Sequence, residues 1–344
     1  MTTLPPSATA SRAVSSPSPL APPVTSATFP SKRPAMISPF VGVFRATVVS
    51  GHHLAELTGL NRGEGVTMAK PPYGVGAGRI KGAGKRQTII AYFSMRGVSF
   101  EDRCSAAAAA GFDGIGYNGA EYLKLRSEGW TDDNFRAILD KYGVRILELE
   151  ALRLLDDDAS RDFEHIARAF GAERIQVIAP FAGNIDIDLQ VAGKWIGDLA
   201  RRTEDADVHY AIEFLPPTRI PDIATAQKVC AIAGHPNVGL CVDTWHVYRG
   251  AGAPSLADLD FARVKNVQVD DGTMKPVDPD YIPDCIHNRE LLGDGEFPLV
   301  DFFRSTPPNA PISVEIIDDD LDLIPAAERA DRMARALERT LARI

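Results

Sequence analysis

The chain lacks several features that would by themselves assign a protein to a class. None of its apolar runs approaches the roughly 18–20 residues that span a bilayer, so we expect no membrane-embedded segment. Its four cysteines are scattered without a C-x-x-C pair, which argues against a zinc ribbon or a disulfide framework and fits reduced thiols in a cytoplasmic protein. Basic residues are in the minority, with 37 Lys and Arg against 46 Asp and Glu, for a net charge of -9. An acidic balance argues against a nucleic-acid partner, which requires a basic face.

The first part of the chain has little that could pack into a core. Residues 1–40 hold nine prolines and eight serines and no acidic residue. Such a composition cannot offset the entropy of ordering, and the first 20 residues lack the continuous apolar stretch of a signal peptide. We therefore expect residues 1–67 to be a disordered or non-native extension and residues 68–344 to form the folded domain.

Met68 offers a second explanation of this extension. The preceding Gly63-Glu64-Gly65 must be encoded by a purine-rich stretch, which resembles a bacterial ribosome-binding site just upstream of a start codon. A genuine N-terminal extension and an internal translation start both remain open at this point.

From about residue 86 the chain alternates short β-branched or aromatic runs with longer helical patterns. Glycines stop several of the predicted helices, for example Gly111, Gly143, Gly171 and Gly234. The predicted strands are 88–94, 112–117, 144–150, 174–180, 209–215, 238–243, 264–270 and 312–317. The first predicted helix runs through the alanine run 106–110. The other predicted helices lie near 131–142, 159–170, 188–204, 222–233, 255–262, 298–304 and 325–343.

Eight strand-then-helix units in about 260 residues indicate an α/β fold of the (β/α)₈ TIM-barrel type. The rival architecture, a doubly wound open sheet, usually carries a glycine-rich phosphate turn after its first strand. Here the first strand is followed by Ser94-Met95-Arg96-Gly97, which is not such a turn. The barrel is therefore favoured, and its chemistry is expected at the C-terminal ends of the strands.

Four consecutive predicted strands carry an oxygen-bearing side chain inside an apolar stretch near this end. The four residues are Glu213, Asp243, Gln268 and Glu315. Buried carboxylates are costly unless they are paired or bind a metal, and three of them with one amide cannot satisfy one another. Each residue taken alone has an ordinary explanation, such as a loop-facing glutamate or an aspartate that caps a turn. The joint pattern favours a site for one divalent metal ion.

The same segments resemble a known family. The stretches IEFLP at 212–216, VDTWH at 242–246, VQVDD at 267–271 and VEI at 314–316 resemble, in this order, the xylose isomerase-like barrel superfamily of sugar phosphate isomerases and epimerases. The segment 289–298 (RELLGDGEFP) looks like that family's G-x-G turn. The resemblance covers roughly residues 86–340. It implies a metal held by Glu213, Asp243, the residue on the seventh strand and Glu315, with His246 in contact with the substrate.

The seventh strand departs from the epimerase pattern. Epimerases usually offer a histidine to the metal there, and this chain has Gln268. An all-oxygen ligand set favours Mg²⁺, Mn²⁺ or Co²⁺ over Zn²⁺. A glutamine at this place also resembles the dehydratase branches, such as the 3-dehydroshikimate dehydratases.

The sequence thus predicts an enzyme that transfers a proton next to a carbonyl group. Glu213 and Glu315 are the predicted acid–base pair, and His246 would hydrogen-bond a substrate oxygen or assist a leaving group. Arg289 could hold an anionic group of the substrate, a surface arginine being the alternative. The expected partner is a small polyhydroxylated substrate, which a metal-dependent isomerase or epimerase would convert, or alternatively a dehydratase of the 3-dehydroshikimate or inosose type. A homo-oligomer is compatible with the sequence.

Two further functions are weaker alternatives. An endonuclease acting at abasic DNA sites would share the fold, but its three-metal cluster needs several histidines besides His246. The remaining histidines lie in the N-terminal extension, in a helix or at the wrong end of a strand, or are otherwise unplaced: His52, His53, His165, His209, His235 and His287. An inactive barrel that serves as a binding subunit is also conceivable, although the intact ligand set argues against it.

Overall fold

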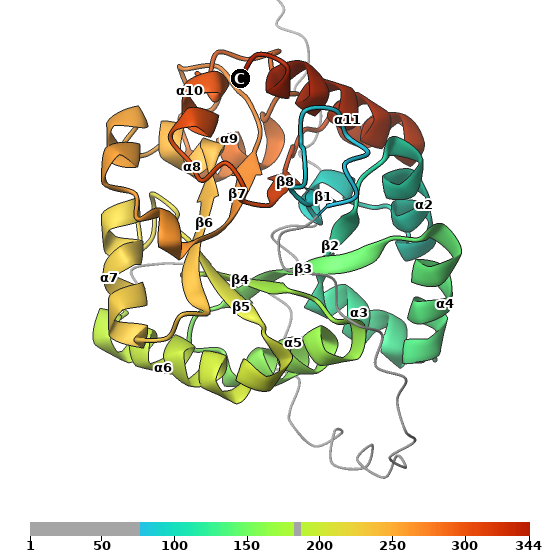
Figure 1. Cartoon of the computed structure of the whole chain (residues 1–344), viewed down its shortest axis with the longest axis horizontal. Helices are drawn as coiled ribbons and strands as arrows, with labels where there is room; N and C mark the ends of the chain where they lie inside the picture. Colours follow the sequence, from blue (N-terminus) through green and yellow to red (C-terminus); the bar gives the residue numbers. More distant parts are fainter. Residues whose placement is uncertain (1–75, 182–186) are drawn as a thin grey trace, which may run out of the picture. The chain divides into compact units, whose positions relative to one another are not determined.

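A computed structural model describes residues 76–181 and 187–344. Eight parallel strands form a closed barrel in which each strand pairs with the next and β8 pairs with β1 (Figure 1). The strands are β1 Thr88–Ile90, β2 Gly114–Asn118, β3 Arg145–Arg153, β4 Arg174–Ile178, β5 His209–Glu213, β6 Val238–Asp243, β7 Val264–Val269 and β8 Ile312–Val314. The (β/α)₈ prediction is therefore confirmed. The predicted extension 1–67 lies outside the described residues.

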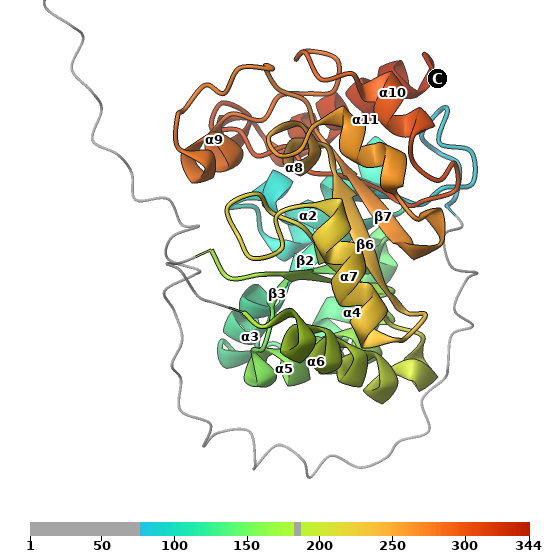
Figure 2. The ribbon, with the colours of Figure 1, turned by 90° about the vertical axis from the view of Figure 1, so that its left-hand side faces the viewer.

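Helices cover the outside of the barrel (Figure 2). They are α2 Phe100–Ala110, α3 Gly119–Ser127, α4 Asp132–Tyr142, α5 Asp157–Phe170, α6 Leu189–Arg202, α7 Ile223–Ala233, α8 Thr244–Tyr248, α9 Tyr281–His287, α10 Leu299–Arg304 and α11 Ala326–Leu341. The glycine stops predicted for α2, α4, α5 and α7 adopt the left-handed conformation that ends a helix. Side-chain caps begin several helices; Asp222, for example, accepts a hydrogen bond from the backbone N–H of Thr225.

The strands are buried on both faces, as expected for a parallel barrel enclosed by helices. Every residue of β4 and of β6 is buried. Strand register aligns the mouth, because Glu213 pairs with Cys241, Asp243 with Gln268, and Val269 with Val314. The C-terminal ends of β5 to β8 therefore lie at neighbouring levels.

Several connections differ from the prediction. The first strand ends at Ile90 rather than 94, and the chain continues as a 3-10 helix, Phe93–Met95. Helix α3 was not predicted. Asn118 is its N-cap, because its side chain accepts hydrogen bonds from the backbone N–H groups of Ala120 and Glu121. The helix predicted near 255–262 is a 3-10 helix, Ala253–Asp258, while α8 follows β6 directly. Helix α9 lies between the seventh strand and the helix predicted near 298–304, where no helix was predicted.

Asp271 organises the G-x-G loop that follows α9. Its Oδ1 accepts hydrogen bonds from the backbone N–H groups of Gly272 and Phe297, and its Oδ2 accepts one from Gly293. A Cβ atom at Gly295 would lie 2.4 Å from Oδ1 of Asp271, so a side chain there would displace the carboxylate. Gly295, the second glycine of the motif, therefore allows the loop to pack closely against Asp271.

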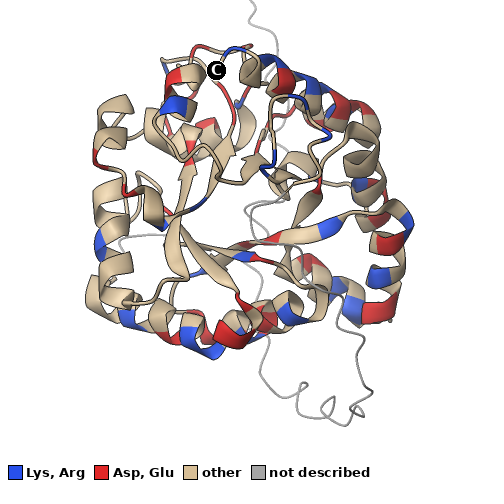
Figure 3. Cartoon of the chain, viewed as in Figure 1, with Lys and Arg blue, Asp and Glu red and all other residues tan. Residues whose placement is uncertain are grey.

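Charged residues of both signs lie along α11, whereas α7 carries few charges (Figure 3). None of the helices within the described ranges is long and apolar enough to cross a bilayer.

Candidate metal centre at the barrel mouth

The structure places all four predicted metal ligands at the C-terminal ends of neighbouring strands. Glu213 is the last residue of β5 and Asp243 the last residue of β6. Gln268 lies one residue before the end of β7, and Glu315 directly follows β8. Their exposed fractions range from 0 to 7 %. Such burial of three carboxyl groups requires compensating cations or shared protons.

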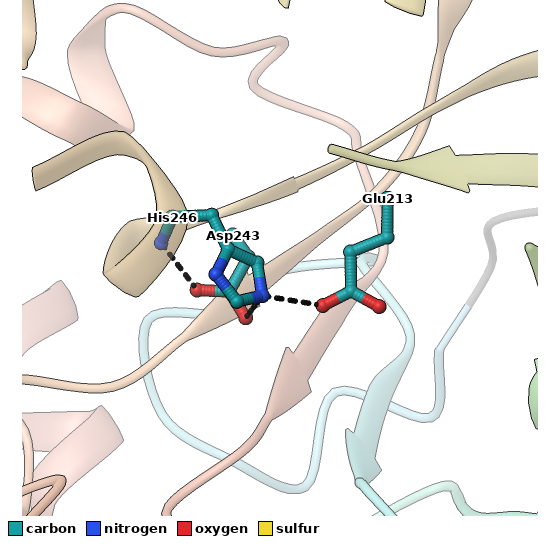
Figure 4. A group of neighbouring side chains, drawn as sticks. All are labelled: Glu213, Asp243 and His246. Carbon is teal, nitrogen blue, oxygen red and sulfur yellow. Dashed lines mark hydrogen bonds and ion pairs between the residues drawn. The ribbon is translucent and has the colours of Figure 1, made fainter. Parts of the chain in front are cut away.

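Glu213, Asp243 and His246 form a compact cluster (Figure 4). One ligand atom from each lies within 4.8 Å of the others. The Nε2 atom of His246 is 2.8 Å from Oε1 of Glu213 and 3.7 Å from Oδ2 of Asp243. Their close approach and burial make these three side chains the part of the predicted site that the structure brings together most clearly.

Local folding explains why His246 lies so close to Asp243. The Oδ1 atom of Asp243 accepts the backbone N–H groups of Trp245 at 2.6 Å and of His246 at 3.4 Å. Asp243 is thus the N-cap of α8, whose first turn carries His246 back to the strand end. The carboxylate has a structural role through Oδ1 and keeps Oδ2 for the site.

Arg289 is buried rather than at the surface, with an exposed fraction of 2 %. Its Nη1 atom is 2.6 Å from Oδ2 of Asp270, 3.0 Å from Oε2 of Glu315 and 3.2 Å from Oδ2 of Asp243. The surface-arginine alternative is therefore wrong. The guanidinium instead lies among the carboxylates of the site, and its predicted contact with substrate stays a prediction.

The carboxyl groups of the mouth have perturbed pKa values. Burial acts to raise the pKa of Asp243, but His246, Arg289 and the backbone N–H of Trp245 together outweigh it, so that this pKa is lowered. Burial raises the pKa of Glu315 and that of Asp270 well above their ordinary values, although Arg289 acts in the opposite direction on both. Raised pKa values mean that burial opposes ionisation of these carboxyl groups, and a bound cation would offset that cost.

Gln268 faces the same interior as Asp243. Its Oε1 atom lies 3.1 Å from Sγ of Cys241, the residue two places before Asp243, and its buried Nε2 atom has no hydrogen-bond partner among the described residues. A side-chain amide fits the same space in two orientations, related by a half-turn, that exchange its oxygen and nitrogen. Turning the amide over would let Nε2 donate to the sulfur and would place a ligand oxygen at the unpartnered position. The donor chemistry of Gln268 thus fits a metal ligand.

The site includes residues that the sequence analysis missed. Asp270 accepts a hydrogen bond from Oγ1 of Thr244 at 2.6 Å as well as the contact from Arg289. The hydroxyl group of Tyr281, on α9, contacts Nδ1 of His246. Asp270 stood in the recognised V-Q-V-D-D stretch, whereas nothing in the pattern around Tyr281 indicated a role.

Two further carboxyl groups lie inside the barrel on β3. Glu148 and Glu150 are fully buried and two residues apart, so they share a face of the strand. Oε1 of Glu150 accepts the backbone N–H of Tyr92 at 3.0 Å, while its buried Oε2 atom accepts no N–H group within the described ranges. The carboxyl group of Glu148 lies within hydrogen-bonding reach of the Glu150 carboxyl group. Burial raises the pKa of Glu150 well above its ordinary value, and the charges of Glu148 and Glu315 add to the rise.

Glu150→Gln is expected to stabilise the metal-free protein, increasingly so as the pH rises. When folding raises the pKa of a carboxyl group, the group contributes its full stability only below its unfolded pKa, near 4.5. This contribution is lost as the pH rises toward the folded pKa, because the folded state then holds a proton that the unfolded state has released. The loss is about 1.4 kcal/mol per pH unit in that window. The measurement is thermal unfolding of chelator-treated wild type and variant between pH 5 and pH 8.

Glu173→Gln provides the matched control. Glu173 is equally buried but is paired with Arg145 at 2.9 Å and hydrogen-bonded to Gln87. Loss of its charge should destabilise the fold near neutral pH. A stability difference between wild type and Glu150→Gln that stays constant with pH would mean that Glu150 does not hold a proton in the folded state.

Comparison with known proteins gives a consistent result for the fold. The family model described as xylose isomerase-like TIM barrel matches residues 104–340. No curated protein sequence matches the chain significantly. Among solved structures, a xylose isomerase-like TIM barrel/4-hydroxyphenylpyruvate dioxygenase fusion protein is 21% identical with a TM-score of 0.64. The match covers 75% of this chain and 43% of the fusion protein.

Three other solved structures match along nearly their whole length. The IolI protein with a bound zinc atom is 15% identical, with a TM-score of 0.65, and the match covers 75% of this chain and 98% of that protein. A probable 3-DHS dehydratase, AsbF, from Bacillus anthracis is 17% identical, with a TM-score of 0.58 and coverage of 73% and 98%. A D-allulose 3-epimerase from Methylomonas sp. in complex with D-allulose is 16% identical, with a TM-score of 0.58 and coverage of 74% and 96%.

Proposed function

The chain belongs to the xylose isomerase-like TIM-barrel family, and from this premise we propose that it is a divalent-metal-dependent isomerase or epimerase. Its substrate would be a small sugar, sugar phosphate or polyol ketone. The observation that carries the proposal is the buried cluster of Glu213, Asp243 and His246, with Glu315 on the same barrel mouth. The printed names of two structural neighbours, an allulose epimerase and a probable dehydratase, support this reaction class.

The donor set fits a divalent cation. Glu213, Asp243, Gln268 and Glu315 would hold it, with His246 beside them, since carboxylate and amide oxygens suit Mg²⁺, Mn²⁺ or Co²⁺. One structural neighbour binds zinc, which is compatible with a metal in this place and leaves its identity here to experiment. When bound, such an ion would polarise a substrate carbonyl as a Lewis acid and ease loss of the adjacent proton.

The chain's own residues would move that proton. Glu213 and Glu315 come from β5 and β8, which are separated by two strands along one side of the barrel and by four along the other. Carboxylates approaching from two directions can remove a proton on one side of a carbon and return it on another, or to the neighbouring carbon. Nδ1 of His246 contacts Tyr281 and its Nε2 contacts Glu213. Once Glu213 turned to a bound cation, Nε2 would be free to hydrogen-bond a substrate oxygen.

Gln268 favours one second candidate, a dehydratase. A dehydratase would use the same proton abstraction but then expel a β-hydroxyl group, with His246 placed to assist the leaving oxygen. Epimerases usually offer a histidine at this place, and the glutamine found here is the observation that supports a dehydratase.

A deuterium-exchange assay tests both reactions. Chelator-treated protein reloaded with Mn²⁺, Mg²⁺ or Co²⁺ would be incubated in D₂O with ketoses, inososes and 3-dehydroshikimate. Deuterium at the carbon next to the carbonyl, with or without a rearranged product, supports the isomerase or epimerase. An unsaturated product supports the dehydratase, and absence of exchange and of product with every substrate and metal would contradict both.

A further inference from the structure

The guanidinium of Arg289 shares oxygen atoms with the proposed metal centre. Its three carboxylate partners are Asp270, Glu315 and Asp243, and the last two are proposed metal ligands. All three carboxylates and the arginine are buried. A fixed positive charge therefore lies where the proposed function places a divalent cation.

The choice of oxygen atoms makes this overlap specific. Oδ1 of Asp243 is used by the backbone N–H groups that begin α8, so Oδ2 is the oxygen left for a metal. Oδ2 is also the atom that Arg289 contacts. Oε2 of Glu315 is the second contact, and the Glu315 carbonyl oxygen accepts from Nη1 as well, at 3.2 Å.

The arginine cannot easily leave this place. Its Nε atom donates to the carbonyl oxygen of Cys285 at 3.0 Å, and its Nη2 atom lies 3.2 Å from Sγ of the same residue on α9. Asp270, which is not among the proposed ligands, makes the shortest carboxylate contact. A metal that enters would therefore remain close to the arginine charge, and like charges in a buried site repel strongly.

We propose that Arg289 is an internal counter-cation, which holds Asp243 and Glu315 in place without metal and weakens the binding of a divalent cation. This inference rests on the proposed function, because it requires the metal centre. It explains how so acidic a barrel interior can fold before metal is loaded. It also predicts the direction of two effects. Neutralising Arg289 should increase the affinity for the metal and should destabilise the metal-free protein. If Arg289 mainly orients its partners, neutralising it would weaken metal binding.

Arg289→Gln is the test variant, since its amide can still donate a hydrogen bond to Asp270. Arg249→Gln is the matched control, because Arg249 is also a largely buried arginine, paired with Asp284 at 2.7 Å and lying over the Trp245 ring. Its hydrogen bonds go to Asp284 and to the carbonyl oxygen of Thr273. The dissociation constant for Mn²⁺ would be measured by titration calorimetry on chelator-treated proteins, together with thermal unfolding with and without Mn²⁺.

The expected result is a dissociation constant about tenfold or more lower for Arg289→Gln than for wild type. Both variants should unfold at a lower temperature without metal, but Mn²⁺ should restore more stability to Arg289→Gln. The control should keep its Mn²⁺ affinity within about threefold of wild type. Unchanged or weaker binding by Arg289→Gln would overturn the inference and leave the proposed function intact. Absence of binding by all three proteins, with Mn²⁺ and equally with Mg²⁺, Co²⁺ and Zn²⁺, would overturn both.

Arg289→Lys keeps the inference testable if Arg289→Gln does not fold. Lysine retains the charge but loses the planar, multi-donor geometry of the guanidinium. A counter-cation role then predicts an affinity within about threefold of wild type. An orienting role predicts a clear loss of affinity, which would contradict the proposal.

Discussion

Replacing either Glu213 or Glu315 by glutamine is expected to lower the turnover number by about 10²- to 10⁴-fold, the usual contribution of a positioned acid or base. Each carboxylate is assigned a share of the proton transfer, and an amide cannot accept that proton. The amide oxygen can still bind a cation, so metal binding should survive in part. The effect should therefore appear mainly in the turnover number, measured with the substrate that the exchange assay identifies.

The control for these variants is again Glu173→Gln, a buried carboxylate paired with Arg145 and remote in role from the mouth. It should lose stability while keeping the turnover number of its folded fraction. If Glu213→Gln or Glu315→Gln kept more than about a tenth of the wild-type rate, that residue would not be the base. Metal content measured on the same samples separates loss of the proton-transfer group from loss of the cation.

The barrel and its mouth were within reach of the sequence because their signals are local and periodic. Short apolar strands and glycine helix stops repeat through the chain, and four consecutive strands each carry one polar residue near their end. The two glutamates of β3 carried the same kind of signal, since the spacing of Glu148 and Glu150 places both on one strand face. Their burial could not be predicted from this spacing, because the sequence does not show which face of β3 points into the barrel.

The position of Arg289 was beyond the reach of the sequence. The arginine follows α9, a seven-residue helix in a long connection with no apolar periodicity to indicate where it packs. Its burial depends on Asp270, Asp243 and Glu315, which lie at three different strand ends and come together only in the tertiary structure. The same holds for Tyr281, whose contact with His246 depends on α9 lying close to the mouth.

Gln268→His is expected to move the metal preference from Mn²⁺ or Mg²⁺ toward Zn²⁺, by about tenfold or more in relative affinity. An imidazole nitrogen replaces an amide oxygen, and nitrogen donors favour Zn²⁺ over the harder cations. The substitution also introduces the histidine that epimerases usually carry on this strand. If strand-seven chemistry separates the two reaction types, the variant should lose elimination more than proton exchange. Elemental analysis and the ratio of dehydration to deuterium uptake measure the two effects.

Gln176→His is the matched control, because Gln176 on β4 approaches the same Cys241 sulfur, with its Nε2 atom 3.8 Å away. Both glutamines are buried and both contact the thiol, so the two variants disturb similar packing. Only Gln268 is paired in register with Asp243, and only its substitution should change the metal preference. An equal shift in both variants, or in neither, would mean that the Gln268 amide serves Cys241 rather than the cation. The oxygen ligands would then reduce to Glu213, Asp243 and Glu315, with His246 beside them to complete the site.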